Sequence, residues 1–185
     1  MCNINKINNK NQYNVVVHEV RLSYPHLFRV SDLSKKYEVK LLLDKNSKMA
    51  EELSAEIEKI RNEHQVPKDN VCLKEFNQES LSIKATSKER EYFTLLDSYN
   101  EIVTEDTNGL FNAGNYVHAQ LVMSIVPVPS KGKFLTCWIK KIKFYKKGEP
   151  LGVDVFANAP KSEEIEVSEI KEIQSEVFEN VEVIA

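Results

Sequence analysis

Residues 131–147 read Lys-Gly-Lys-Phe-Leu-Thr-Cys-Trp-Ile-Lys-Lys-Ile-Lys-Phe-Tyr-Lys-Lys, and this stretch indicates the type of fold. Apolar residues recur at every second position, which is the period of a β-strand. Successive side chains of a strand point to opposite faces of the sheet. The residues expected on the buried face are Leu135, Cys137 and Ile139, and those expected on the opposite face are Phe134, Thr136, Trp138 and Lys140.

The outward face of this strand combines aromatic rings with positive charge. The stretch holds seven lysines, no carboxylate and the only tryptophan of the chain. Exposed aromatic side chains forgo a few kcal/mol of burial energy. Single-stranded nucleic acid would explain that cost, because bases stack on rings and phosphates bind ammonium groups. Two alternatives stay open: Trp138 packs under a loop or another strand, as most tryptophans are largely buried, and the lysines are only a solvated face.

The composition is that of a soluble globular domain. The chain has 185 residues, of which 42% are hydrophobic and 29% charged. No apolar run approaches the ~18 residues of a membrane span, and the N-terminus lacks a hydrophobic signal segment. The three cysteines are far apart in the sequence and form no Cys-x-x-Cys pair, which argues against zinc and against a disulfide framework. We therefore expect a protein of the reducing cytoplasm.

Charge is distributed unevenly along the chain. Residues 161–185 carry eight glutamates against two lysines, a net charge of −6, while the remainder has 23 basic and 20 acidic residues. A mildly basic body with an acidic tail is expected where the tail and a polyanion compete for one surface. We predict a disordered arm over residues 1–12, a domain over 13–160 and an acidic tail over 161–185. The tail is either a mobile arm or a docked amphipathic helix, because its isoleucines and valines have helical spacing.

Alternating apolar residues predict several short strands and one helix. The predicted strands cover residues 13–24, 36–43, 81–86, 91–97, 116–126 and 131–147. Between the second and third strand, Met49, Leu53, Ile57 and Ile60 have helical spacing and predict an amphipathic helix up to about Gln65. This count favours a mainly β protein with a closed barrel of five or six strands. We expect an OB-fold-like barrel whose helix follows the second strand, whereas in the usual OB-fold order it follows the third.

Three segments resemble a family of bacteriophage single-stranded-DNA-binding proteins. They are residues 21–28 with 36–43 (Arg-Leu-Ser-Tyr-Pro-His-Leu-Phe and Lys-Tyr-Glu-Val-Lys-Leu-Leu-Leu), residues 114–121 (Gly-Asn-Tyr-Val-His-Ala-Gln-Leu) and residues 142–152, which end in Lys-Gly-Glu-Pro-Leu-Gly. The resemblance covers roughly residues 14–158. It implies an OB-fold that coats single-stranded DNA in phage replication or recombination, often with an acidic C-terminal tail. The chain departs from the family pattern at Cys137–Lys141, before the last hairpin.

The candidate nucleic-acid-binding residues come from the last strand, from outward positions of other strands and from a loop. Tyr24, His26 and Phe28 follow the first strand, at a rim that OB-folds use for ligands; the alternative is that Leu27 and Phe28 close the end of the barrel. The full predicted set is Lys131, Lys133, Phe134, Trp138, Lys140, Lys141, Lys143, Tyr145, Lys84, Tyr116, Tyr24 and Phe28.

Catalytic and metal-binding patterns are scarce, so we predict neither an enzyme nor a cofactor. The four histidines lack ligand spacing. Gly109 and Gly114 have the spacing of a phosphate-binding loop, but Asn115 and Tyr116 replace the Lys and Ser/Thr that such a loop needs. The best nuclease-like cluster is Asp97 with Glu105 and Asp106, in loops where carboxylates usually serve solubility.

The expected partner is single-stranded DNA, bound without sequence preference. Replication or recombination proteins are expected at residues 161–185, and a homo-oligomer is possible. A protein-interaction module that uses the aromatic face of the last strand is the alternative function. Salt dependence distinguishes the two, because phosphate binding weakens steeply with added salt.

Overall fold

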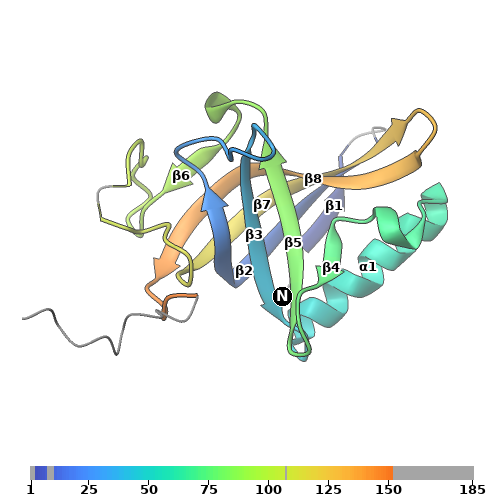
Figure 1. Ribbon diagram of the computed structural model, residues 1–185. Coiled ribbons are helices and arrows are strands. Elements are labelled where there is room, and N and C mark those ends of the chain that lie inside the picture. Colours follow the sequence, from blue (N-terminus) through green and yellow to red (C-terminus); the bar gives the residue numbers. More distant parts are fainter. Residues whose placement is uncertain (1–2, 8–10, 107, 152–185) are drawn as a thin grey trace, which may run out of the picture. The chain divides into compact units, whose positions relative to one another are not determined.

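Five long strands form a closed ring in the computed structural model, which describes residues 3–7, 11–106 and 108–151. The ring runs β2 (Gln12–His26), β3 (Tyr37–Asp44), β5 (Ser80–Ser87), β8 (Gly132–Lys146) and β7 (Tyr116–Val128), which returns to β2. All neighbours are antiparallel except β5 and β8, which run parallel. Figure 1 shows β3 and β5 side by side in front of the long β7–β8 hairpin. The mainly β, OB-fold-like architecture is confirmed, although the ring is not a regular barrel.

Shorter elements extend or cover the ring. β1 (Asn3–Lys6) pairs with β2, β4 (Leu73–Glu75) with β5, and β6 (Thr94–Leu96) with β8. Two single 3₁₀ turns, η1 (Lys68–Asn70) and η2 (Arg90–Tyr92), lie in the connections. β1 and β4 were not predicted, because such short strands leave no clear periodic signal in the sequence. The predicted strand over residues 91–97 is found only at Thr94–Leu96, since Arg90–Tyr92 form η2.

The only α-helix in the described residues is α1 (Lys48–His64), between β3 and β5 as predicted. It begins at Ser47, whose side chain accepts a hydrogen bond from the Ala50 amide at 3.1 Å, and ends at Gln65 in the left-handed conformation. A side-chain oxygen at this position satisfies an amide that has no partner within the helix. The apolar stripe is confirmed: Leu53, Ile57 and Ile60 are buried against the sheet. Figure 1 shows α1 beside β4.

The N-terminal residues differ from the expectation of disorder. Asn3–Lys6 form β1, which pairs with Tyr13–Val16 of β2. Residues 1–12 hold few apolar side chains, but the backbone pairing that forms β1 does not require them. β3 pairs only with the later part of β2, from Arg21 onward, so the earlier edge of β2 is free to receive β1. Ile4 also packs against the core.

The core lies inside the ring and is built from the alternating positions of each strand. Leu135, Cys137 and Ile139 of β8 are buried, as predicted, together with Val117, Ala119, Leu121 and Met123 of β7. The described elements form one compact unit that reaches Leu151. The predicted domain boundary at residue 160 and the tail 161–185 lie outside the described residues. None of the described helices is long and apolar enough to cross a lipid bilayer.

The segments that carry the family resemblance meet at one junction. Arg21 donates from Nε to the Gly114 carbonyl at 3.1 Å and from Nη2 to the Glu149 carbonyl at 2.5 Å. Asn115 is buried and accepts a hydrogen bond from the Gly148 amide at 3.1 Å. A side chain at Gly114 or Gly148 would collide with the backbone of the other segment. These motif residues therefore hold the end of β8 against the start of β7.

Candidate nucleic-acid interface

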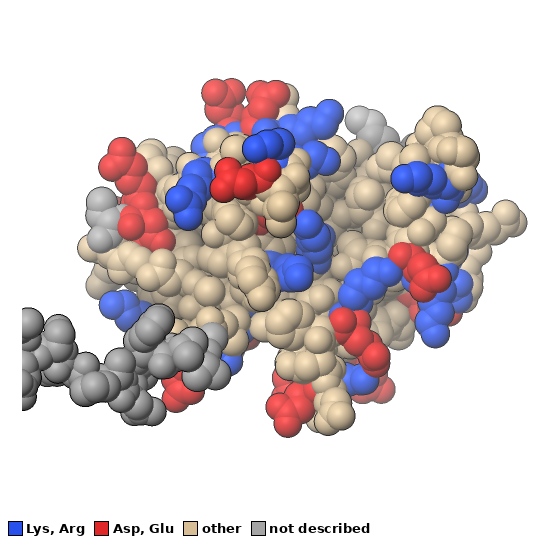
Figure 2. Space-filling model, in the orientation of Figure 1, with Lys and Arg blue, Asp and Glu red and all other residues tan. Residues whose placement is uncertain are grey.

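The outer surface of β3 and β5 gathers basic and aromatic side chains from five segments. Lys40 of β3 lies opposite Lys84 of β5, Ser23 of β2 lies opposite Lys40, and Thr86 of β5 lies opposite Trp138 of β8. We call this surface the β3–β5 face and define it by Tyr24, Lys40, Phe76, Lys84 and Trp138. Figure 2 shows basic side chains near the middle of the side of the molecule that carries β3 and β5. The face unites three predicted residues with two, Lys40 and Phe76, that were not predicted as site residues.

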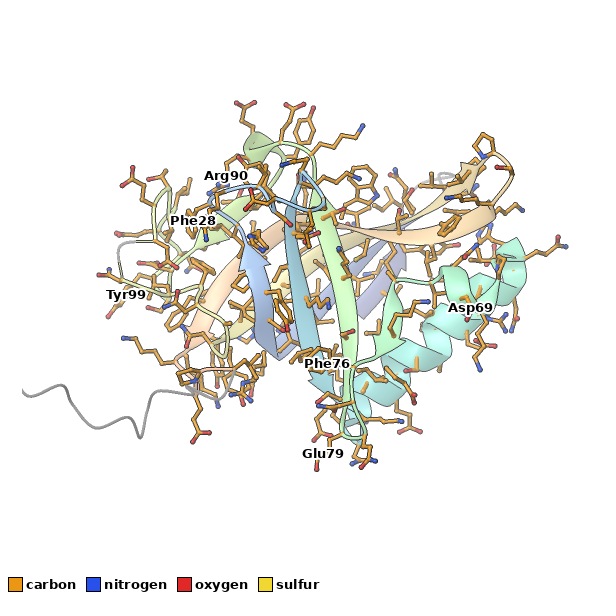
Figure 3. The ribbon with its side chains drawn as sticks, in the orientation of Figure 1. Phe28, Asp69, Phe76, Glu79, Arg90 and Tyr99 are labelled. Carbon is orange, nitrogen blue, oxygen red and sulfur yellow. The ribbon has the colours of Figure 1, made fainter. Side chains whose placement is uncertain are left out.

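Lys40 forms the centre of this face, with an aromatic ring on two sides. Its Nζ lies 5.0 Å from the centroid of the Tyr24 ring and 5.9 Å from that of Phe76. Cation–π attraction of this kind is worth about 0.5–1 kcal/mol at an exposed site. Tyr24 is 64% exposed and Phe76 39%, so both rings still offer surface to a ligand. Figure 3 labels Phe76 beside the lower half of β5.

The exposure of Tyr24 has a backbone cause. Its φ is +47°, in the left-handed region, and the pairing of β2 with β3 shifts register between Ser23 and His26. A bulge of this kind redirects a side chain relative to the regular pleat. The outward position of Lys40 was visible from the strand period. Phe76 had no such signal, because it lies in the turn after a strand of only three residues.

Lys84 is partly neutralised by an acidic neighbour on the same face. Its Nζ forms an ion pair with Glu38 Oε2 at 2.8 Å, and the Glu38 side chain is only 14% exposed. Burial raises the pKa of Glu38, but Lys84 and the nearby hydroxyls of Ser34 and Ser31 lower it more, so the pKa lies below its ordinary value of 4.5. Glu38 is therefore ionised at neutral pH and reduces the charge that Lys84 offers to a phosphate. Lys40 has no such ion pair among the described residues.

Trp138 is half-buried and lies on the outer side of the ring. Its indole Nε1 donates to Thr136 Oγ1 at 3.2 Å, and Thr136 Oγ1 donates to the Ser124 carbonyl at 3.1 Å. Val122 of β7 and Thr86 of β5 are its partners across the sheet. The outward direction is thus confirmed and a place in the core is excluded. The neighbouring strands cover part of the ring, as one of the alternatives expected.

A one-residue bulge at Lys140 separates the lysines at the start of β8 from those at its end. Gln120 lies opposite Lys141 but Leu121 opposite Ile139, so Lys140 is the extra residue. Beyond it the alternation reverses: Ile142 and Phe144 are buried, while Lys141 and Tyr145 are exposed. Lys143 donates from Nζ to Asn100 Oδ1 at 2.7 Å and so holds a loop. A one-residue bulge cannot be read from a strand period, so the sequence prediction did not include it.

A second aromatic and basic cluster lies on the outer side of β7 and β8. We call it the β7–β8 face and define it by Arg21, Tyr116, His118, Tyr145 and Lys146. Lys146 Nζ is 5.0 Å from the Tyr116 centroid and 5.4 Å from that of Tyr145, and the His118 and Tyr145 centroids are 4.7 Å apart. Burial, followed by the charge of His18, lowers the pKa of His118, so this ring is neutral at pH 7. Arg21 connects the two faces, because it lies opposite Leu42 of β3 and Tyr116 of β7.

Phe28 packs at the end of the ring. Its ring centroid is 6.0 Å from that of Phe111 and 6.0 Å from the guanidinium carbon of Arg90, and Leu27 is buried. Arg90 is fixed by hydrogen bonds to the carbonyls of Phe93 and Val103, and Figure 3 shows Arg90 and Phe28 next to each other. This geometry agrees with the alternative in which Leu27 and Phe28 close the barrel end.

Lys131, Lys133 and Phe134 lie at the start of β8, beside the C-terminal end of α1. Lys133 Nζ donates to the His64 carbonyl at 3.0 Å, and Asn70 donates to the carbonyls of Lys131 and Lys133. The predicted residues are therefore spread over the β3–β5 face, the β7–β8 face and this hairpin end. The structure does not unite them in one patch.

Two of the three carboxylates considered as a nuclease-like cluster, Asp97 and Asp106, accept hydrogen bonds in turns, and Glu105 is exposed. Asp97 Oδ1 accepts hydrogen bonds from the amides of Tyr99 and Glu101, and Asp106 accepts from the amides of Leu110 and Phe111. Within the described residues, no group of three His, Cys, Asp or Glu side chains could hold a metal ion. Cys72 and Cys137, distant in sequence, interact in space. Cys72, followed by burial, raises the pKa of the Cys137 thiol, which disfavours the nucleophilic thiolate.

The Glu38–Lys84 pair predicts a pH effect on stability. Because folding lowers the pKa of Glu38, its stabilising contribution is present above pH 4.5 and is lost as the pH falls through the folded-state pKa. The melting temperature of Glu38→Gln should lie below that of the wild type at pH 7, and the difference should shrink below pH 4.5. Thermal melts of both proteins from pH 7 to pH 3 measure this. A difference that does not depend on pH would show that the ion pair contributes nothing.

Comparison with known proteins gives matches among solved structures only. No protein-family model matches the chain, and no curated protein sequence matches it. The structure of the "single-stranded DNA-binding protein from bacteriophage Enc34 in complex with ssDNA" is similar with a TM-score of 0.64 and 20% identity, over 80% of this chain and 96% of that chain. The structure of gp2.5, "a single-stranded DNA binding protein encoded by bacteriophage T7", is similar with a TM-score of 0.56 and 10% identity, over 82% and 96% of the two chains. The chain therefore has the fold of these bacteriophage proteins.

Proposed function

We propose that this chain binds single-stranded DNA without sequence preference on the β3–β5 face. The observation that carries the proposal is the position of Lys40 between the exposed rings of Tyr24 and Phe76, with Lys84 and Trp138 on the same surface. Rings stack on any base, and ammonium groups bind phosphates, so this combination needs no particular sequence. The outer side of the second and third strands of an OB-fold is a common site for oligonucleotides, and β3 and β5 occupy those two positions in the ring.

The similar structures support the same class of ligand. The Enc34 protein, which shares the fold, was solved in complex with single-stranded DNA. We further propose a role in phage DNA replication or recombination, in the cytoplasm of the bacterial host. A catalytic role is not proposed, because Asp97 and Asp106 serve as turn acceptors and the Cys137 thiol is buried.

The alternative is a protein-interaction module that uses the same aromatic surface. The ion pair between Lys84 and Glu38 is compatible with either ligand. Salt dependence separates the two functions, because only phosphate binding releases condensed counterions.

Salt titrations test both the function and the face. The slope of log affinity against log salt for an oligo(dT) should be steep. Lys40→Ala should reduce its magnitude by about 0.7, and Lys84→Ala should reduce it by less, because Lys84 is already paired with Glu38. Lys59→Ala, on the exposed side of α1, is the matched control and should leave the slope unchanged. A flat slope for the wild type would contradict DNA binding. A slope that falls only with Lys146→Ala would move the DNA to the β7–β8 face.

The exposed ring of Tyr24 gives a test of stacking. Tyr24→Ala should weaken binding to oligo(dT) by ~1–3 kcal/mol with little change in melting temperature, because the ring is 64% exposed. Tyr99→Ala removes an even more exposed ring, on a remote turn, and should leave affinity for a short oligonucleotide unchanged. Trp138→Ala should also weaken binding, with some loss of stability because the ring is half-buried. Equal effects of Tyr24→Ala and Tyr99→Ala would contradict a stacking role for Tyr24.

We also propose that residues 161–185 compete with DNA for the basic body and recruit replication or recombination proteins. Their net charge of −6 attracts them to the lysines of the domain. Truncation after Pro160 should tighten binding at low salt, and the gain should shrink as salt screens charges beyond a Debye length of ~10 Å at 0.1 M. Affinity and melting temperature of both forms measure this. Equal or weaker binding of the truncated form at every salt concentration would exclude competition.

A further inference from the structure

An ordered turn presents two large apolar side chains to solvent at the end of the domain that carries β6. We call residues 97–106 the acidic turn. Tyr99 is 83% exposed and Ile102 is 70% exposed. Figure 3 shows Tyr99 at the outer edge of the molecule, pointing away from the sheet. Exposed apolar groups held together on one ordered segment are typical of an interaction surface.

The turn is held rigidly in this conformation. Asp97 Oδ1 accepts hydrogen bonds from the Tyr99 amide at 2.8 Å and the Glu101 amide at 2.9 Å, and the Asp97 amide donates to the Glu101 carbonyl at 3.0 Å. Ile102 pairs with Leu96 of β6. Lys143 of β8 reaches the turn through its bond to Asn100. The exposure of the two apolar side chains is therefore a property of the fold.

The charge of this turn is unsuited to DNA. Residues 97–106 contain four carboxylates and no basic residue. Glu101 and Glu105 are exposed and, with Ile102, help to line a shallow cleft of about 350 Å³. Phosphates would be repelled from such a surface, whereas a basic protein segment with apolar groups would be attracted.

A segment of that chemistry lies at the opposite end of β8. We call residues 127–133, Pro-Val-Pro-Ser-Lys-Gly-Lys, the basic hairpin tip; it carries two lysines and no carboxylate, and Pro127 and Pro129 are exposed. Lys133 lies ten positions before Lys143, about 33 Å along an extended strand. Figures 1 and 2 show the β7–β8 hairpin with basic side chains at one end of the domain and β6 with acidic side chains at the other.

The β3–β5 face lies between these two ends. It meets β8 at Trp138, midway between Lys133 and Lys143 in the sequence. A strand of DNA that crosses this face would place the next bound copy of the protein beside one of the two ends of the domain. An acidic, apolar surface at one end and a basic, apolar segment at the other form a heterologous contact, which repeats along a polymer instead of closing into a dimer.

We propose that adjacent copies of this chain on one DNA strand contact each other head to tail, the acidic turn of one against the basic hairpin tip of the next. The proposal rests on the DNA-binding function and adds cooperativity to it. The contact depends on two exposed clusters of opposite charge, so it is weak in the absence of DNA and is strengthened when DNA places the copies side by side.

Charge reversal at each end, with a combined variant, tests the contact. The first variant is Glu101→Lys with Glu105→Lys, the second is Lys131→Glu with Lys133→Glu, and the third combines all four changes. Glu51→Lys with Glu56→Lys on α1 is the control, because it changes net charge as the first variant does. The measured quantity is the half-saturation concentration on poly(dT) divided by the dissociation constant for an oligo(dT) that holds one copy. This ratio cancels any direct contact of Lys131 or Lys133 with DNA.

The first and second variants should each raise the ratio by about threefold to tenfold, the combined variant should return it toward the wild-type value, and the control should leave it unchanged. Melting temperatures identify any variant that is unfolded. A wild-type ratio equal to that expected for independent binding would overturn the proposal while leaving DNA binding intact. The same holds if the combined variant shows no rescue. Loss of oligo(dT) binding by the wild type would instead refute the proposed function itself.

Discussion

Closure of the five-stranded ring depends on the parallel contact between β5 and β8, in which Thr86 lies opposite Trp138. Without this contact the strands would form an open sheet in which the short strands β4 and β6 cover only part of the edges of β5 and β8, and unpaired edges promote association with other chains. Closure also creates the candidate interface, because it brings the outer side of β8 next to that of β5. The half-buried state of Trp138 follows from this position, since its indole packs against the two neighbouring strands while one side of the indole faces outward. Structure and proposed function therefore depend on the same pair.

The long strands and the helix were predictable because their signals are local. The alternation in β8 and β7 and the four-residue spacing of Leu53 and Ile57 each place one face against a core, whatever the rest of the chain does. Pairing that depends on distant segments was not predictable. β1 was missed because its strand conformation comes from a free edge on β2, and the bulge at Lys140 exists only relative to Gln120 and Leu121 of the partner strand.

The candidate interface was predictable in its chemistry but not in its location. Aromatic residues and lysines without a counter-charge indicated the type of ligand, and Lys84, Tyr24 and Trp138 do share a face. The sequence could not show that Lys143 is tied to Asn100 or that Phe28 closes the end of the ring. These outcomes depend on which loop covers which strand. Phe76 could not be predicted for the same reason. A residue in a turn joins the candidate interface only because the fold brings it next to Lys40.

The distribution of charge on the domain suggests why the face is only moderately basic. Binding that is not sequence-specific gains most of its affinity from counterion release, so each lysine that neutralises a phosphate adds a similar amount to the binding free energy. A protein that coats a transient single strand must also leave it when the strand is copied or paired. The ion pair between Glu38 and Lys84 links β3 to β5. In the proposed function, the same ion pair also reduces the contribution of Lys84 to DNA affinity. Lys40 forms no ion pair among the described residues, and its attraction to the rings of Tyr24 and Phe76 orients it without adding a counter-charge. In the proposed function, affinity is therefore concentrated where phosphate binding and stacking can occur together.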